Sequence, residues 1–413
     1  MMELYTFGFD AQSRAPRAAD VSAPPTPIRK AEAIKVLWAS WCDVVIITQD
    51  HTGEWSPEYI GTSLTAPQKD HISQSKYLKS ACMDGCVVNF FGSEMHDGLR
   101  GYVISRSEAT LGNVDRVVLF ATELEIEEGW PAVDTYSESG EYIIVDVKIL
   151  GGGDVLLSTK SRPSGEEQVI QMQSIADLRA HLTSSSKSSS THSSIASFKP
   201  TQWCVNSTTG TALDQDGRVH TFTRDSRYPK CLGRPYEGAS SFEPVSYLSE
   251  TCVTKVASGG YLSAAVSSDS ELFLWGQACP GSAVELKVLN GTEESNPSSP
   301  ERKSKKTSIG AEGEQDEFVK CMEAQIDGHQ TLVYDVAIGH GHVLVAAEVL
   351  LSNGTTGRTV LGAGDNSRGQ LGWETTSGFA EEFREVSALR GKRVAQSVAA
   401  GWSSFVVTLG DES

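Results

Sequence analysis

The chain has 413 residues, is 39% hydrophobic, and carries 53 acidic against 35 basic residues, a formal net charge of −18. This charge repels phosphate backbones and the basic run at 302–306 (RKSKK) is short, so direct binding of nucleic acid or nucleosomes is disfavoured. No apolar run approaches the roughly 20 residues that span a bilayer, which excludes a membrane helix. The 38 glycines, scattered among short apolar runs, favour an all-β protein.

The cysteines indicate a reducing compartment. They lie in or beside strand-like runs and lack the paired framework of a small secreted domain. The first ten residues (MMELYTFGFD) contain no apolar core of the kind that marks a signal peptide. We therefore expect a soluble protein of the cytoplasm, the nucleus or both. The cysteines are at positions 42, 82, 86, 204, 231, 252, 279 and 321.

A strand-turn-strand unit recurs along the chain. After a short strand at 4–8 (LYTFG), a first unit opens at 34–40, turns at Trp41 and continues through 43–48. Apolar runs of this length, separated by Gly, Ser and Asp turns, are typical of antiparallel strands. For the second unit we predict strands at 81–85, 87–91 and 101–104, and for the third, strands at 143–150 and 155–157 around Gly151, Gly152 and Gly153.

Two segments interrupt this pattern. Residues 168–182 have helical spacing and precede a Ser-rich run at 183–194, so we predict a helical and Ser-rich excursion over 160–200. Residues 290–316 mix charges with Ser and Pro, which predicts a disordered inserted loop.

The later units are clearer. The fourth begins at Trp203 and turns through 214–217 into a strand at 218–222. The fifth, 253–276 (VTKVASGGYLSAAVSSDSELFLWG), contains a whole strand-corner-strand-turn-strand unit. The sixth and seventh begin near Val336 and Val398.

The two ends of the chain complement each other. The last unit, 398–407, has the opening half of the pattern, and 4–8 (LYTFG) has the closing half, as in 272–276 (LFLWG). Sharing one blade between the terminal strands would close a ring and remove the free sheet edge. Corners near Trp41, Gly85, Gly152, Gly210, Gly260, Gly339 and Gly401 predict seven units of about 59 residues in a single domain, 1–413. Three units are faint, so six or eight blades are the alternatives.

One segment carries a family resemblance. Residues 364–372 (GDNSRGQLG) match the G-x-N-x-x-G-Q-L-G signature of the regulator of chromosome condensation repeat, with Ala363 where that family usually has Trp. The chain therefore resembles this family, and the resemblance implies a seven-bladed β-propeller closed by sharing its N- and C-terminal strands in one blade. The acidic composition and the insertions most resemble the fungal alpha-tubulin suppressor type.

Four bulky residues occupy the same place in their units. Trp41 and Trp402 directly follow the small residue that ends an opening strand, and His340 and Tyr261 stand at the corresponding positions. In the family this corner lies near one face of the disc, so these side chains would form a partner-binding surface. The alternative for each of them is packing between blades.

The sequence contains no catalytic or ligand-binding motif that we recognise. His340 and His342 are two residues apart but have no further ligands at metal-binding spacing, and Cys82 and Cys86 have the wrong spacing for a zinc knuckle. Gly362, Ala363 and Gly364 fall in a strand and not between a strand and a helix, as a dinucleotide fingerprint requires. We expect no metal, no cofactor and no enzymatic activity.

Two functions follow from the resemblance. The first is a non-catalytic interaction module, a monomer or a heterodimer with a protein partner. The resemblance to the fungal type implies a particular partner, a small zinc-ribbon electron carrier. That carrier serves diphthamide synthesis and Elongator-dependent modification of wobble uridine in tRNA. The alternative is a guanine-nucleotide exchange factor for a Ran-like GTPase, the activity of the founding member of the repeat family. The acidic net charge of this sequence departs from the pattern of that member. An enzyme on a propeller scaffold, such as a lyase, is the third class.

Overall fold

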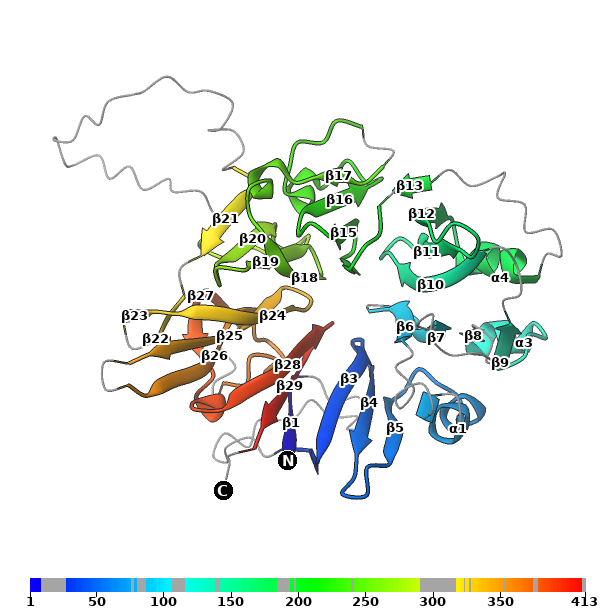
Figure 1. Cartoon of the computed structure of the whole chain (residues 1–413), viewed down its shortest axis with the longest axis horizontal. Helices are drawn as coiled ribbons and strands as arrows, with labels where there is room; N and C mark the ends of the chain where they lie inside the picture. Colours follow the sequence, from blue (N-terminus) through cyan, green and yellow to red (C-terminus); the bar gives the residue numbers. More distant parts are fainter. Residues whose placement is uncertain are drawn as a thin grey trace.

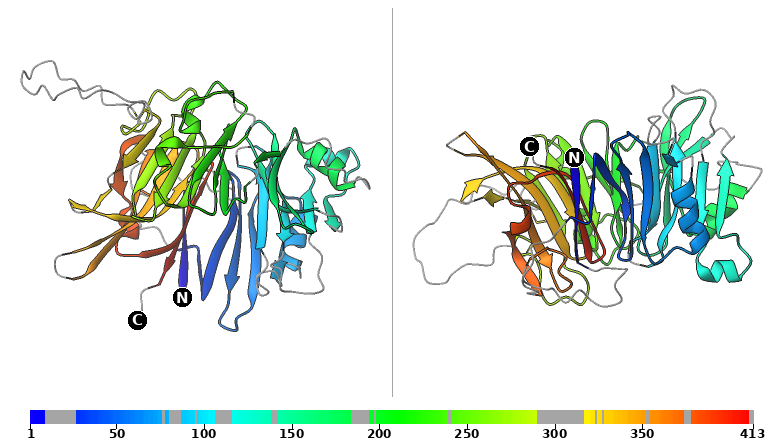
Figure 2. Two further views of the ribbon diagram at one scale, coloured as in Figure 1. Left: turned by 45° about the horizontal axis from the view of Figure 1, so that its top comes forward. Right: turned by 90° about the horizontal axis from the view of Figure 1, so that it is seen from below.

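The computed structural model describes residues 1–8, 27–75, 78–79, 87–94, 96–105, 116–137, 142–183, 194–196, 198–238, 241–289, 317–322, 324–326, 328–351, 354–373 and 378–410. Seven antiparallel sheets lie in a ring around a central axis, so the predicted seven-bladed β-propeller is confirmed (Figure 1). From the side, the strands run across the thickness of a flat ring (Figure 2).

Each blade has its first strand nearest the axis, and the first strands of neighbouring blades contact one another. We number the blades in chain order. Blade 1 is β3-β4-β5 (Ala33–Ala39, Asp43–Gln49, Trp55–Gly61), and blade 2 is β6-β7-β8-β9 (Val87–Ser93, Gly98–Ser105, Arg116–Phe120, Val133–Ser137). Blade 3 is β10-β11-β12-β13 (Tyr142–Ile149, Val155–Ser161, Glu167–Met172, Ser194–Ala196), and blade 4 is β14-β15-β16-β17 (Gln202–Val205, Thr209–Leu213, Val219–Thr223, Glu243–Pro244).

Blade 5 is β18-β19-β20-β21 (Val253–Gly259, Leu262–Ser267, Leu272–Gly276, Val319–Met322), and blade 6 is β24-β25-β26-β27 (Leu332–Ile338, His342–Leu350, Thr356–Asp365, Phe379–Glu385). A small two-stranded sheet, β22-β23 (Gln325–Ile326, His329–Gln330), lies between blades 5 and 6 in the chain. Blade 7 is β28-β29-β1-β2, with bounds Arg393–Ala400, Ser403–Leu409, Met2–Gly8 and Arg29–Ala31.

Blade 7 closes the ring as predicted. The N-terminal strand β1 pairs antiparallel with β29 over its whole length, from Met2 opposite Leu409 to Gly8 opposite Ser403. Buried apolar residues of β1 and β29, among them Leu4 and Val407, pack with Ile34 and Ile46 of blade 1. The interface between the two ends of the ring is therefore an apolar core like those between the other blades.

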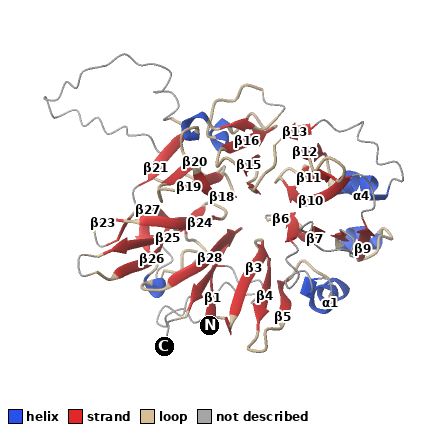
Figure 3. Ribbon diagram, viewed as in Figure 1, coloured by secondary structure: helices blue, strands red, loops and turns tan. Residues whose placement is uncertain are grey.

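The helices lie on the outer rim of the ring (Figure 3). Those that lie wholly within the described residues are α1 (Ala66–Gln74), α3 (Glu123–Glu127) and α4 (Ile175–Thr183), together with the short 3₁₀ turns η1 (Pro229–Leu232), η2 (Ser246–Leu248) and η3 (Ser387–Leu389). Within the described residues, no helix is both long and apolar enough to cross a membrane.

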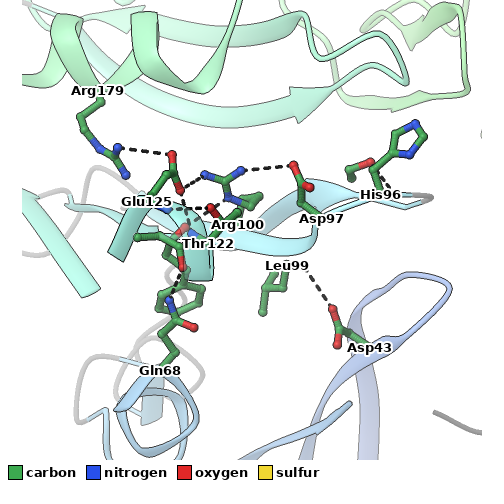
Figure 4. A network of polar contacts seen from close by, with 12 residues as sticks. Asp43, Gln68, His96, Asp97, Leu99, Arg100, Thr122, Glu125 and Arg179 are labelled. Carbon is green, nitrogen blue, oxygen red and sulfur yellow. Dashed lines mark hydrogen bonds and ion pairs between the residues drawn. The ribbon is translucent and has the colours of Figure 1, made fainter. Parts of the chain in front are cut away.

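A polar network ties the helices of blades 2 and 3 together (Figure 4). Glu125 of α3 accepts from Arg100 of β7 at 2.7 Å and pairs with Arg179 of α4 at 3.4 Å. Both arginine side chains are at least 92% buried, with exposures of 8% and 5%. Burial raises the pKa of Glu125, but hydrogen bonds from Thr122 and the two guanidinium charges outweigh burial and lower it.

A β-bulge recurs in the first strand of five blades. A bulge turns a neighbouring side chain away from its regular direction. In four of the five strands, the residue that follows the register shift is polar. The register shifts fall between Val36 and Trp38, Ile144 and Asp146, Val253 and Lys255, Val333 and Asp335, and Val394 and Gln396.

Polar side chains at or beside these bulges bond to the next blade and form a belt around the axis. Two of these bonds reach the backbone of a residue at a bulge, Val145 in blade 3 and Val36 in blade 1. The contacts join Asn89 to Val145, Asp146 to Trp203, Gln202 to Val256, Lys255 to Asp335, Asp335 to Ser397, and Gln396 to Val36. Between blades 1 and 2, Asp43 accepts from the backbone N–H of Leu99 at 3.2 Å.

Three details of the sequence prediction were wrong. Residues 87–91 belong to the first strand of blade 2 and not to its second, because β6 continues to Ser93 and the chain turns at Glu94. Gly210 lies inside β15, and the corner of blade 4 precedes it. Residues 168–172 belong to the strand β12 and not to a helix, which begins only at Ile175.

Several predicted features lie outside the described residues. They are the strand at 81–85 with Gly85, Cys82 and Cys86, most of the Ser-rich run (184–193), the inserted loop at 290–316, and the basic run at 302–306.

Candidate partner-binding face

The connections between the first and second strands of the blades, here called corners, meet at one face of the ring. The backbone N–H of Trp41 donates to the carbonyl of Glu94 at 2.9 Å, and that of Ser207 donates to Gly260 at 2.8 Å. The N–H of His340 donates to the carbonyl of Gly401 at 2.8 Å. These hydrogen bonds join three pairs of neighbouring corners, those of blades 1 and 2, 4 and 5, and 6 and 7.

Glycine at Gly401 permits this close approach. Its φ is +54°, and a Cβ built there would lie 2.4 Å from the Cβ of Trp41. A side chain at this position would be strained and would push the neighbouring corner away. Glycine precedes Trp402 because only a residue without a side chain lets the corners of blades 7 and 1 pack this closely.

Three of the four predicted site residues come together. The rings of Trp41 and Trp402 lie edge to face, with centroids 6.4 Å apart at 74°, and the ring of His340 lies 6.0 Å from Trp402 at 79°. Such geometry is preferred by aromatic pairs. All three are half-buried. This aromatic cluster, defined as Trp41, Trp402 and His340, joins blades 1, 6 and 7.

Two contacts orient the tryptophans. The indole N–H of Trp41 donates to the carbonyl of His96 in blade 2 at 3.0 Å. The guanidinium of Arg368, an exposed residue of blade 6, lies 6.0 Å from the centroid of Trp402. This second distance is at the limit of a cation–π contact. Arg368 therefore covers part of one face of Trp402.

Tyr261, the fourth predicted residue, makes a different contact. Its ring packs on Tyr228, with centroids 5.0 Å apart, and the guanidinium of Arg227 lies 5.4 Å from the ring of Tyr228. Tyr228 and Arg227 were missed because they follow the third strand of blade 4 and do not stand at a corner. An Arg-Tyr pair beside a corner tyrosine carries no repeat signal in the sequence.

The two histidines of blade 6 have separate roles. Burial lowers the pKa of His340, with Asp365 opposing, so its imidazole is neutral near pH 7. His342 is fully buried in β25, and burial lowers its pKa to about 4. The Nε2 atom of His342 lies 2.9 Å from the hydroxyl of Ser404 in blade 7. His342 therefore packs between blades, and His340 lies at the face.

A cavity of about 360 Å³ opens beside the aromatic cluster. Trp402 and His340 form part of its wall, and the rest comes from Leu262 of blade 5, from 278–289 and from blade 6. A larger cavity of about 810 Å³ lies at strand ends away from the corners. Two of its lysines are paired, Lys148 with Asp146 at 3.0 Å and Lys199 with Glu167 at 3.2 Å. These lysines are not free to bind an anion.

The signature residues that resemble the family repeat are structural. Asn366 and Gln370 are fully buried. The side-chain oxygen of Asn366 accepts from the backbone of Leu371 at 2.9 Å, and that of Gln370 accepts from Arg368 at 2.8 Å. Side-chain bonds of this kind hold a turn. Among the residues that the structure describes, no group of three or more His, Cys, Asp or Glu side chains is arranged to hold a metal ion.

Comparison with known proteins identifies the fold. No family model matches the sequence, and no curated protein matches it. Solved structures do match: Prp20p from Saccharomyces cerevisiae has 12% identity and a TM-score of 0.55, and covers 100% of this chain and 92% of its own. Yeast RCC1 (Prp20) in its complex with Kap60 has 11% identity and a TM-score of 0.58, over 100% and 90%. The chain shares the seven-bladed propeller fold of yeast RCC1.

Proposed function

We propose that this protein is a non-catalytic interaction module whose corner face binds another protein. The observation that carries the proposal is the aromatic cluster: three large side chains from three blades meet at one face and stay half-exposed. Clustered, partly exposed tryptophans are typical anchors of protein interfaces. Propellers of the same fold support it, because Prp20p is described with binding properties to Gsp1p and histones, and yeast RCC1 was solved bound to Kap60.

We propose a small zinc-ribbon electron carrier as the partner, in diphthamide synthesis and Elongator-dependent tRNA modification. The resemblance of the acidic, insertion-bearing sequence to the alpha-tubulin suppressor type supports this choice. The competing candidate is a Ran-like GTPase, on which the protein would act as an exchange factor. Its support is the fold shared with a propeller that binds Gsp1p.

The test is affinity purification of the tagged protein from its own cells, followed by mass spectrometry. Wild type is compared with Trp41→Ala/Trp402→Ala and with Trp55→Ala, a matched control at the strand end opposite the corners, where Trp55 faces Gln49 across the β4-β5 pair. Circular dichroism and urea unfolding confirm that each variant is folded.

The proposal expects a zinc-ribbon protein or an Elongator-pathway component in the wild-type and Trp55→Ala samples, and its loss from the double variant. Recovery of a Ran-like GTPase, together with faster release of labelled GDP from that GTPase, would establish the exchange-factor function instead. Equal recovery of the partner by a folded double variant would show that the tryptophans only pack between blades.

A further inference from the structure

The cavity beside the aromatic cluster is built by the chain that follows blade 5. Residues 277–289 leave β20 and lie against blade 6, where the backbone N–H of Lys287 donates to the carbonyl of Glu381 at 3.0 Å. The ammonium of Lys287 pairs with Glu382 at 2.9 Å. This segment, here called the cavity segment (277–289), supplies half of the residues that line the cavity. Trp402 and His340 also line it.

The wall is mainly apolar. Its apolar side chains include Val284 and Leu286 of the cavity segment, Phe379 of β27, and Trp402. Leu286 is buried, with 2% exposure, whereas Val284 is 37% exposed, so an apolar surface is left uncovered at the mouth. Uncovering a large apolar side chain costs free energy that a partner's apolar side chain would recover on binding.

The charged groups of the wall have one sign. Among the described residues that line the cavity, the charged side chains are Glu285 and Asp365. Glu285 accepts from the backbone N–H of Ala278 at 2.8 Å, and Asp365 accepts from that of Ser367 at 2.9 Å, so both carboxylates are held in place. Arg368 lies over Trp402 but does not line the cavity.

The remaining polar groups of the wall are neutral near pH 7. Burial, together with the charge of Asp365, raises the pKa of the Cys279 thiol to about 11. Burial lowers the pKa of His340, against the influence of Asp365. With these groups neutral, the carboxylates of Glu285 and Asp365, which line the cavity, leave it with a net negative charge.

We propose that this cavity takes one apolar side chain of the protein partner, next to a lysine or arginine that lies against Glu285 and Asp365. The proposal rests on the proposed function, because it names the chemistry by which the partner is recognised at the same face. A volume of about 360 Å³ is at the small end of the range for ligand pockets, so it holds one large side chain and is too small for a large cofactor. The apolar wall supplies affinity, and the carboxylates select a cation over an anion.

The direct test titrates short peptides of known sequence and follows a fluorine label on Trp402, which lines the cavity. The full chain is labelled with 5-fluorotryptophan, and the ¹⁹F resonance of Trp402 is assigned from the Trp402→Phe variant. Acetyl-Gly-Leu-Lys-Gly-amide is then titrated up to roughly 10 mM, the range in which a contact of this size is measurable. Acetyl-Gly-Leu-Glu-Gly-amide and acetyl-Gly-Gly-Lys-Gly-amide are the matched peptides.

The expected result is a saturable shift of the Trp402 resonance with the Leu-Lys peptide. Replacing leucine by glycine lowers the affinity about tenfold, since the buried apolar area is lost. Replacing lysine by glutamate lowers it at least about threefold, since one favourable charge contact becomes repulsive. Glu285→Gln, which keeps the acceptor for Ala278, reduces the preference for lysine over glutamate, and Val284→Arg abolishes the shift.

The proposal is overturned if the Leu-Lys peptide leaves the Trp402 resonance unmoved, if the glutamate peptide binds as tightly, or if Val284→Arg binds like wild type. Affinity purification of the partner distinguishes failure of the cavity proposal from failure of the proposed function. If the partner is lost from Trp41→Ala/Trp402→Ala and is still captured by Val284→Arg, the corner face binds the partner, and the cavity is not part of the binding site.

Discussion

The side-chain amide of Gln396 makes two hydrogen bonds to the backbone of Val36, a residue 360 positions earlier in the chain. Its oxygen accepts from the Val36 N–H at 2.9 Å, and its NH₂ donates to the Val36 carbonyl at 2.8 Å. Val36 lies at the bulge of β3, and Gln396 follows the bulge of β28. The belt of polar contacts thus continues across the junction where the two ends of the chain close the ring.

Gln396→Ala should lower the free energy of unfolding by about 1–3 kcal/mol, because it leaves both backbone groups of Val36 without their partner. Urea unfolding would show this as a lower midpoint at an unchanged slope. Arg393→Ala, at an exposed position of the same strand, is the matched control and should stay within about 0.5 kcal/mol of wild type. An unchanged midpoint for Gln396→Ala would mean that water replaces the amide fully.

Glu125→Ala should destabilise the protein by about 3–5 kcal/mol, because it leaves the buried guanidinium groups of Arg100 and Arg179 without their shared carboxylate. Thermal unfolding followed by circular dichroism measures the effect. Glu123→Ala, at an exposed position of the same short helix, should change little. If the two variants unfold alike, the network of Figure 4 does not contribute to stability.

His342 should make the protein less stable in acid. Burial lowers its folded pKa to about 4, below the unfolded value of about 6.5, so the unfolded chain binds more protons between these values. The contribution is fully present above pH 6.5 and is lost as the pH falls toward 4. Across that range it amounts to about 3 kcal/mol at most, from 1.36 kcal/mol per pKa unit.

The measurement is urea unfolding at pH 7, 6, 5 and 4 for wild type and His342→Gln. The variant should be less stable at pH 7, because the packing beside Ser404 is disturbed, but its stability should fall less between pH 6.5 and 4. Parallel pH profiles would show that other groups account for the acid sensitivity.

How far the sequence predicted the fold depended on its turns. The fifth unit was predicted closely, because Gly260, Ser270 and Gly276 all have positive φ and mark the corner, the hairpin and the end of the third strand. Blade 2 has Glu94 and not glycine at its corner, so a glycine outside the described residues was taken in its place. Residues 168–172 misled because a short run of mixed polarity fits helix and strand periodicity equally.

The site was predictable only where it follows the repeat. Trp41, Trp402 and His340 stand at equivalent positions, and a closed ring brings such positions to one face. The pairing of Tyr261 with Tyr228 and the cavity beside Trp402 depend on connections between outer strands, which differ from blade to blade. The belt depends on bulges, and a bulge leaves no mark in a pattern of apolar residues.

Gly401 links the stability of the ring to the geometry of the aromatic cluster. Gly401→Ala would place a Cβ 2.4 Å from that of Trp41 at a φ of +54°, so it should cost about 1–3 kcal/mol and separate Trp41 from Trp402. Gly152→Ala, in the corner of blade 3, is the matched control because a Cβ there meets no atom within 4 Å. Urea midpoints and partner capture should both fall in Gly401→Ala and stay unchanged in Gly152→Ala. A Gly401→Ala protein of normal stability that still captures the partner would show that the corners can move apart without loss of the binding face.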